Sequence, residues 1–402
     1  MVPSIPLFDE ILLPTNIPIP SGFRLRALRN DDYGYLDLLK QLSSVGYINQ
    51  LGFRKQFDAM KKAKSYYIVL LEHNGSSKIV GAATLLIEFK YIHEAGTRGR
   101  IEDVVIDGSM RGEELELLLN RVLVDMAENL GVYKLSLECK TEKIAFYNKL
   151  GYTKTHHFLD QLFDEPNFIS FAKPADDSLF NDNAIPTDLE IPDGIRARAL
   201  RSGDMDYLNL LEQLTSVGHV TEYDFQQRFL SMRNTGSYYI VILEDINSSK
   251  IVGAATLVVE LKYIHECGRR GRVEDVVVDE SMRGKKLGAL LNKALVEMAK
   301  NLGSIIIHDM QSTRNGKVIQ EVDEQQTNNE NPNRKNTRNV LHKRARTPPA
   351  GADVVGDNPN ISRCILKRAL PLTANRNSNY RKTTNTSCTE HLLRALTRYP
   401  FY

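Results

Sequence analysis

The chain has 402 residues, of which 42% are hydrophobic and 25% charged, proportions typical of a soluble globular protein with two or three domains. No apolar run reaches the roughly 18–20 residues of a membrane-spanning helix, and the proline-interrupted N-terminus lacks the basic start of a signal peptide. The four cysteines show no metal-binding spacing. Reduced thiols and a cytoplasmic location are therefore expected.

A long internal repeat is the main feature of the sequence. Residues 22–131 and 194–303 align without a gap at an offset of 172 residues. "QLSSVG" (Gln41–Gly46) recurs as "QLTSVG" (Gln213–Gly218), and "SKIVGAATL" (from Ser77) recurs unchanged. Solenoid repeats are only about 20–50 residues long, so this period indicates a duplicated domain.

The repeat divides the chain into five segments. These are an N-terminal extension (1–21), copy 1 (22–171), a linker (172–193), copy 2 (194–303) and a tail (304–402). The tail carries 16 Lys and Arg against 8 Asp and Glu, whereas the rest carries 36 against 42. Its Asn, Thr, Arg and Pro content predicts mostly disordered chain. The basic stretch Arg334–Thr347 could bind nucleic acid, but a solvated tail, or a divergent splice form or reading frame, is the favoured interpretation.

Alternation and helical periodicity predict the elements of copy 1 in chain order. They are a strand at Phe23–Leu28, helices at Asn30–Val45 and Leu51–Ala63, strands at Ser65–Glu72, Lys78–His93 and Gly99–Ile106, a helix at Arg111–Gly131, a strand at Tyr133–Cys139 and a helix at Thr141–Gly151. A last strand near Phe158–Phe163 is left open. This order predicts an α+β domain with a mixed, largely antiparallel sheet flanked by helices.

Copy 2 repeats this pattern only through its long helix, Gly284–Asn301. The missing strand would leave the edge of Arg272–Val278 unpaired, which is unfavourable. Ser304–Met310 contains three consecutive isoleucines, a residue type that strands prefer. We therefore predict a substitute strand there, and no packed structure beyond about Gln311.

The strongest chemical signal lies at a strand-to-helix junction of copy 2, "DESMRGKKLGALL" (Asp279–Leu291). Backbone N–H groups and the helix dipole at such a junction favour an anion. Gly284 and Gly288 permit close approach, and Lys285 and Lys286 add positive charge. By itself this pattern is only weak evidence for an anion-binding site.

Several motifs together make the signal specific. "RGRVEDVVVD" (Arg270–Asp279) precedes this junction, and copy 1 continues as "YKLSLECKTEKIAFYNKLGYT" (Tyr133–Thr153). With "KIVGAATL" and "ELKYIHECG" they resemble the GNAT superfamily of acetyl-CoA-dependent N-acetyltransferases, and within it most closely the glucosamine 6-phosphate N-acetyltransferases. The resemblance covers most of both copies and none of the tail. It implies acetyl transfer from acetyl-CoA, without a metal, to an amino-sugar phosphate in UDP-N-acetylglucosamine synthesis.

The resemblance also implies residue roles. Catalysis would use the backbone around Asp103 and Val104, and Asp275 and Val276, with Glu138 orienting the amine and Tyr147 protonating the CoA thiolate. An oxyanion contact at the valine N–H is worth roughly 3 kcal/mol. Acetyl-CoA would bind Glu274, Asp275, Val276, Arg283, Gly284, Lys285, Lys286, Leu287 and Gly288. The sugar phosphate would bind Ser43, Lys90, His93, Glu102, Tyr133, Lys134, Thr215, Lys262 and His265.

Each copy departs from the family pattern in a different place. Copy 1 has Glu113, Glu114 and Glu116 where copy 2 has Lys285, Lys286 and Gly288, which predicts poor CoA binding by copy 1. Copy 1 also lacks the basic residue that the family places near its C-terminus. Copy 2 has no counterpart of Glu138 or Tyr147. Because the family forms dimers that exchange the last strand, a homodimer or an intrachain pseudo-dimer is expected, and one copy could complement the other. A non-catalytic or weakly active protein, and an acetyltransferase for another amine, remain the alternatives.

Overall fold

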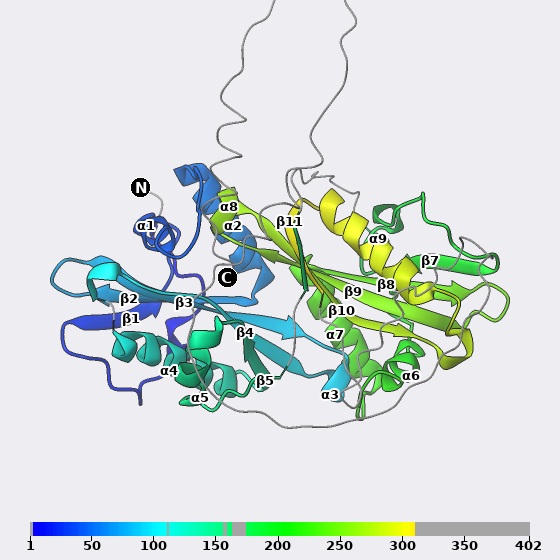
Figure 1. Ribbon diagram of the computed structural model, residues 1–402, viewed down its shortest axis with the longest axis horizontal. Helices are drawn as coiled ribbons and strands as arrows, with labels where there is room; N and C mark the ends of the chain where they lie inside the picture. Colours follow the sequence, from blue (N-terminus) through cyan, green and yellow to red (C-terminus); the bar gives the residue numbers. More distant parts are fainter. Residues whose placement is uncertain (1–2, 111, 156–158, 163–173, 310–402) are drawn as a thin grey trace, which may run out of the picture. The chain divides into compact units, whose positions relative to one another are not determined.

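The computed structural model describes residues 3–110, 112–155, 159–162 and 174–309. The tail, with Arg334–Thr347 and everything beyond Gln311, lies outside the described residues. Within the described part, each copy forms a mixed sheet with helices packed on it, as the sequence predicts (Figure 1). No helix there combines the length and apolar character needed to cross a membrane.

Copy 1 contains a five-stranded sheet in the order β1-β2-β3-β4-β5. Its β4 and β5 pair in parallel and the other neighbours are antiparallel. The elements are β1 (Phe23–Ala27), α1 (Gly34–Leu39), α2 (Gln50–Ala63), β2 (Tyr66–His73), β3 (Lys78–Phe89), α3 (Ile92–Ala95), β4 (Thr97–Ile106), α4 (Glu113–Asn129), β5 (Val132–Leu137), α5 (Ile144–Asn148) and β6 (Leu159–Leu162).

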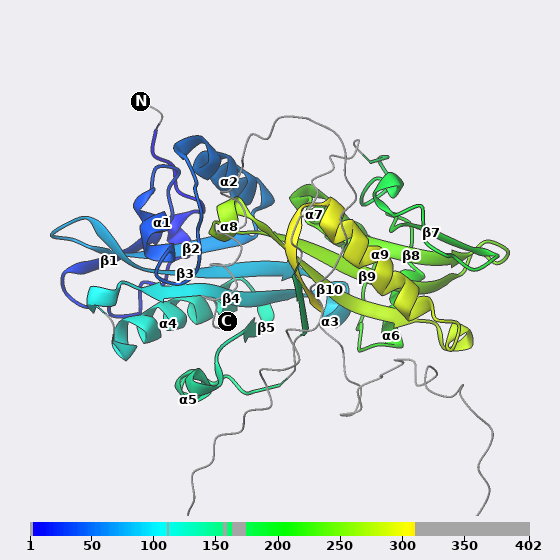
Figure 2. The same cartoon turned by 45° about the horizontal axis from the view of Figure 1, so that its top comes forward.

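Copy 2 repeats the order up to its long helix. Its elements are β7 (Ile195–Ala199), α6 (Tyr207–Glu212), α7 (Glu222–Thr235), β8 (Tyr238–Asp245), β9 (Ile251–Leu261), α8 (Ile264–Cys267), β10 (Arg269–Val278), α9 (Leu287–Asn301) and β11 (Ser304–Asp309). Short 3₁₀ turns complete the two copies, η1 (Glu10–Leu12), η2 (Gly108–Met110), η3 (Thr141–Lys143), η4 (Asp182–Ala184) and η5 (Glu280–Met282). Helix α9 lies across the sheet of copy 2 (Figure 2).

The substitute strand predicted after copy 2 is confirmed. Strand β11 pairs in parallel with β10, from Arg269↔Ser304 to Val273↔Asp309. The last strand of copy 1, β6, does form, but it pairs antiparallel with β11 instead of joining the sheet of its own copy. Copy 2 therefore has a six-stranded sheet, β6-β11-β10-β9-β8-β7, to which both copies contribute.

Hydrogen exchange should reflect this position of β11 between two strands. We expect the amides of Ile305–Ile307 to exchange about as slowly as those in the middle of β10, because ladder hydrogen bonds protect them. Exchange measured residue by residue on the full chain would check this. Fast exchange at Ile305–Ile307 beside a protected β10 would contradict the pairing.

The described parts of the predicted extension and linker, residues 3–21 and 174–193, pack against the folded copies. Leu7 and Phe8 are buried in the core of copy 1, and Leu179 and Phe180, 172 residues later, are buried in the core of copy 2. Isolated bridges join Pro6 to Arg29 and Ser178 to Arg201. The repeat thus begins earlier than Gly22, because Leu7 and Phe8 recur at the same offset as Leu179 and Phe180 and are buried in both copies.

The "KYIH" segments adopt a conformation that the sequence pattern does not indicate. We predicted a strand through His93, but β3 ends at Phe89 and three non-glycine residues, His93–Ala95, have left-handed φ angles of 51–59°. His265–Cys267 do the same in copy 2, with φ angles of 51–62°. The reason lies in the other copy, whose "SVG" loop accepts hydrogen bonds from these turns.

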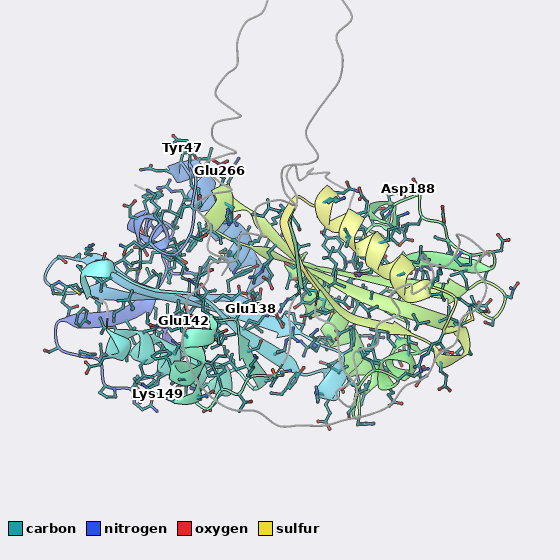
Figure 3. The ribbon with its side chains drawn as sticks, in the orientation of Figure 1. Tyr47, Glu138, Glu142, Lys149, Asp188 and Glu266 are labelled. Carbon is teal, nitrogen blue, oxygen red and sulfur yellow. The ribbon has the colours of Figure 1, made fainter. Side chains whose placement is uncertain are left out.

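These backbone hydrogen bonds join the copies symmetrically. The amide of Glu94 donates to Val217 O (2.7 Å), and that of Glu266 donates to Val45 O (2.8 Å). The Tyr47 amide also donates to Glu266 Oε1 (3.4 Å), and both side chains are labelled in Figure 3. The helix predicted at Asn30–Val45 is shorter in the structure, because α1 ends at Leu39. Val45 lies instead in the loop that accepts the hydrogen bond from the other copy.

Each copy also inserts an aromatic side chain into the core of the other. Tyr91 of copy 1 is 3% exposed and packs on Phe225 and Tyr207, with ring centroids 4.6 and 5.6 Å apart. Tyr263 of copy 2 packs on Phe53 in the same way, at 4.8 Å. Neither core is complete without a residue from the other half of the chain.

Candidate functional site

A β-bulge lies in the middle of β10 and at the same place in β4. Glu274 pairs with Thr256 and Val277 with Ala254, so Asp275 and Val276 together oppose one residue of β9. The same shift occurs around Asp103 and Val104 in β4. Asp103 and Asp275 have left-handed φ angles of 52° and 53°. A bulge takes its extra residue out of the sheet ladder, so the valine amide is available to an external acceptor.

The bulge lies at the end of the parallel pairing. The ladder of β4 and β5 ends at Ile101↔Leu137, directly before Glu102 and Glu138. The ladder of β10 and β11 ends at the equivalent pair, Val273↔Asp309. A carbonyl group at this end of the paired strands can therefore accept a hydrogen bond from the valine amide of the bulge.

In copy 2 an exposed loop follows β10 and leads into α9. Arg283, Gly284, Lys285 and Lys286 are exposed, with left-handed φ angles at Gly284 (80°) and Lys286 (56°). The first helical hydrogen bond runs from Leu290 N to Lys286 O (3.0 Å). The backbone amides of the first helical turn come before this bond and are therefore not part of the helical hydrogen-bond ladder. Such amides, together with the helix dipole and two lysines, favour a phosphate or pyrophosphate.

The "QLTSVG" motif holds this loop in place. Gln213 Nε2 donates to Asp279 Oδ2 (3.1 Å), and Gln213 Oε1 accepts from the Glu280 amide (2.9 Å). Lys250 Nζ also donates to Asp279 (2.8 Å), and with Ser281 it lowers the pKa of that carboxyl. The motif therefore has a structural role at the loop, which the sequence reasoning did not assign.

The corresponding loop of copy 1 is built differently. Helix α4 begins at Glu113, the counterpart of Lys285, whereas α9 begins two residues later at Leu287. The Glu116 carboxylate, where copy 2 has Gly288, accepts from Lys143 Nζ at 2.8 Å. A longer helix and an ion pair thus occupy the region that is an open cationic loop in copy 2.

The predicted catalytic side chains Glu138 and Tyr147 lie on copy 1. Glu138 Oε1 accepts from Arg100 Nη2 at 2.6 Å, at the end of β5 where Figure 3 labels it. Tyr147 is 8% exposed, and burial, Glu116 and Cys139 all raise the pKa of its hydroxyl. Tyr147 is therefore associated with the glutamate-bearing loop and not with the cationic loop.

Two of the three lysines expected to bind the sugar phosphate are paired with carboxylates across the copies. Lys90 of copy 1 is 3% exposed, and it contacts Glu274 and donates to Asp275 Oδ2 at 2.8 Å. Lys262 of copy 2 contacts Glu102 and donates to Asp103 Oδ2 at 3.3 Å. Each lysine thus neutralises the bulge of the opposite copy, and this pairing is what the sequence reasoning missed.

Buried arginines extend this charge network between the copies. Arg98 contacts Glu274, and Arg270 contacts Glu102. Arg272 is fully buried and bridges Glu260 (2.8 Å) and Glu88 of the other copy. Burial would raise the pKa of Glu274, but Arg272, Arg98 and Lys90 hold it well below its usual range. The sequence signal for this network was the presence of charged residues at alternate positions of an otherwise apolar strand.

Four other predicted sugar-phosphate residues, His93, Tyr133, Lys134 and Thr215, group around the bulge of copy 2. The ring of Tyr133 lies against His93, with centroids 4.4 Å apart. Partial burial lowers the pKa of Lys134, as do Arg98 and Lys90, while Glu274 opposes them. Thr215 precedes Ser216, whose carbonyl accepts from the His93 amide (3.3 Å).

The sequence-predicted residues therefore fall into two composite groups, each drawn from both copies. Site 1 comprises Ser43, Glu102, Asp103, Val104, Glu138 and Tyr147 of copy 1 with Lys262 and His265 of copy 2. Site 2 comprises Thr215, Glu274, Asp275, Val276 and Arg283–Gly288 of copy 2 with Lys90, His93, Tyr133 and Lys134 of copy 1.

The two sites are not equivalent. The register of β11 places Ile305 and Ile306 where β5 has Tyr133 and Lys134, so site 1 has two isoleucines in place of this tyrosine and lysine. Tyr147 of site 1 also interacts with the Glu116 charge of the glutamate-bearing loop. Site 2 combines the cationic loop with Lys90, His93, Tyr133 and Lys134 of copy 1. At the offset of 172 residues, however, the sequence of copy 2 has Met310 in place of Glu138.

Comparison with known proteins matches both copies to the same family. The family model for acetyltransferase (GNAT) matches residues 27–152 and 205–316, more than half of the chain. The second match extends past Gly303 and includes β11.

Curated relatives match about a third of the chain. A probable glucosamine 6-phosphate N-acetyltransferase of Drosophila melanogaster is 43% identical over 131 residues, 32% of this chain and 60% of that protein. The glucosamine 6-phosphate N-acetyltransferase of Arabidopsis thaliana is 31% identical over 145 residues, 35% of this chain and 97% of that protein. The crystal structure of the Arabidopsis enzyme aligns with 35% of this chain and 99% of its own, at 30% identity and a TM-score of 0.34.

Proposed function

Because the chain belongs to the acetyltransferase (GNAT) family, we propose that it transfers the acetyl group of acetyl-CoA to the amine of D-glucosamine 6-phosphate, and that it does so at site 2. One observation carries this assignment. Site 2 joins a strand bulge, the cationic loop Arg283–Lys286 and the copy 1 residues Tyr133 and Lys134. Curated relatives of this specificity support the choice of acceptor.

Each part of site 2 suits one part of the reactants. The amides and lysines of the loop would receive the CoA pyrophosphate. The Val276 amide would donate to the oxygen of the tetrahedral intermediate, a contact whose loss typically costs about 10²–10³ in rate. Lys134 and His93 would supply donors to the sugar phosphate, since Lys90 is already paired with Glu274 and Asp275.

The chemical step requires a proton to leave the attacking amine and another to reach the CoA sulfur. By family resemblance Tyr147 would protonate the sulfur and Glu138 would orient the amine, and both lie on copy 1. At site 2 the thiolate would therefore leave without a positioned tyrosine from the described residues. A general acid contributes typically 10²–10⁴ in rate, so we expect slow turnover.

A second candidate function follows from the same observation. If the reaction needs a positioned acid and base, site 2 would bind acetyl-CoA and the sugar phosphate without turnover. The chain would then be a binding or regulatory protein with the acetyltransferase fold. The separation of Tyr147 from the cationic loop favours this alternative over an enzyme for a different amine.

Release of free CoA by the purified full chain distinguishes these functions. We expect release from acetyl-CoA with D-glucosamine 6-phosphate and much less with D-glucosamine, which lacks the phosphate. No release, with both ligands binding by calorimetry, would support the binding protein. Release that is equal with other primary amines would refute the proposed acceptor.

The tyrosine provides a further prediction. If site 2 carries the reaction, Tyr147→Phe should lower kcat less than about threefold, because the hydroxyl belongs to site 1. If site 1 carries it, the loss of a general acid should lower kcat about 10²-fold or more. Steady-state kinetics on the full chain, with the melting temperature as a check of folding, would decide between the sites.

A further inference from the structure

The bulge of copy 2 is held in an unfavourable backbone conformation. Asp275 is not a glycine, yet its φ is 53° in the middle of a strand. Non-glycine residues keep such angles only where their surroundings enforce them. The N–H of Val276 is attached directly to the carbonyl carbon of Asp275, so its direction depends on the backbone angles of Asp275.

The group that fixes Asp275 comes from the other copy. Lys90 Nζ donates to Asp275 Oδ2 at 2.8 Å and also contacts the Glu274 carboxylate. Lys90 is 3% exposed, and although burial alone would lower its pKa, Asp275 and Glu274 keep it above its usual range. A charged, buried ammonium thus holds the carboxylate of Asp275, which is part of the bulge, and that of Glu274, directly before it.

The opposite side of the bulge is also packed. Tyr207 of copy 2 is 1% exposed, and its burial together with the nearby Asp275 charge raises the pKa of its hydroxyl. The bulge is therefore fixed from copy 2 on one side and from copy 1 on the other.

We propose that Lys90 is a positioning residue for acetyl transfer at site 2: from copy 1 it holds the Asp275 backbone of copy 2 so that the Val276 amide points at the thioester oxygen. This rests on the proposed function. It differs from the expected role of Lys90 as a ligand of the sugar phosphate, because its ammonium is buried against carboxylates. It also makes copy 1 necessary for turnover without any chemistry at site 1.

The test compares Lys90→Met with Lys262→Met in the full chain. Both substitutions remove a buried ammonium from an equivalent carboxylate pair, so the second is a matched control for lost interface stability. We expect the kcat of K90M to fall at least tenfold below that of K262M, with the KM for glucosamine 6-phosphate changed less than threefold. A raised KM with kcat retained would show a phosphate ligand and overturn the proposal, as would equal losses of kcat in both variants.

A rescue keeps the test valid if K90M is poorly folded. Glycine adopts a positive φ without steric strain and removes one unpaired carboxylate. The double variant Lys90→Met, Asp275→Gly should therefore recover at least tenfold in kcat over K90M. A double variant that folds but is no more active than K90M would overturn the proposal.

A spectroscopic readout separates this inference from the proposed function. With ¹⁵N-valine labelling, K90M should shift the Val276 amide resonance more than K262M does, and K262M should mainly shift Val104. If wild-type protein releases no CoA, the proposed function fails while the resonances still report the bulge. An unshifted Val276 in K90M would refute the positioning role regardless of turnover.

Discussion

Replacing Lys285, Lys286 and Gly288 by glutamate is expected to weaken acetyl-CoA binding roughly 30-fold or more. These substitutions give copy 2 the residues of copy 1 and change the formal charge at three positions from +2 to −3. Two like charges about 4 Å apart repel each other by on the order of 1–4 kcal/mol. A loss of about 2 kcal/mol in binding free energy, which corresponds to the roughly 30-fold loss of affinity, is therefore a low expectation. Isothermal titration of the full chain would measure it.

The fold should tolerate these changes. The three positions are exposed or half-buried, and a Cβ on Gly288 would lie 3.9 Å from its nearest neighbour, on Val278. The melting temperature should consequently change little. Undiminished affinity in a folded variant would show that the loop does not receive acetyl-CoA.

The reciprocal exchange in copy 1 is the matched control. Glu113→Lys, Glu114→Lys and Glu116→Gly should release Lys143 from its ion pair and add a second acetyl-CoA per chain to the titration. A stoichiometry that remains at one would mean that the earlier start of α4, and not charge alone, closes this loop.

Tyr91→Ala is expected to reduce the free energy of unfolding by about 3–5 kcal/mol, as for other large buried aromatics. The side chain is 3% exposed and packs on Tyr207 and Phe225 in the core of copy 2, although it belongs to copy 1. Its removal should therefore loosen the joint between the copies. Urea denaturation followed by circular dichroism would measure the change.

Two controls accompany this variant. Tyr91→Phe should be nearly neutral, because the buried Tyr91 hydroxyl has no hydrogen-bond partner among the described residues. Tyr223→Ala, at a side chain 68% exposed, should change stability by less than about 0.5 kcal/mol. If Tyr91→Ala behaved like Tyr223→Ala, the two cores would not depend on exchanged aromatics.

The local features of the chain could be predicted from sequence because they depend on neighbouring residues. The alternation of apolar residues predicted most strands, and three isoleucines predicted β11. Charge alone distinguished the loop at Lys285 and Lys286 from that at Glu113 and Glu114. The "EDV" segments predicted where a backbone amide would be available, and the bulges at Asp103 and Asp275 lie there. The roles of these residues in catalysis stay predictions.

The pairing of segments across the repeat was decided only by the tertiary structure. Two copies with the same motifs offer the same partners, so the sequence cannot say whether Lys90 faces Asp103 or Asp275, or whether β6 joins β5 or β11. Contacts at long range select among these alternatives: Tyr91 fits the core beside Tyr207, and the turn at His93 fits the loop at Ser216. The sequence by itself thus determined a duplicated acetyltransferase-like domain with one cationic loop, and packing between the copies decided which residues surround that loop.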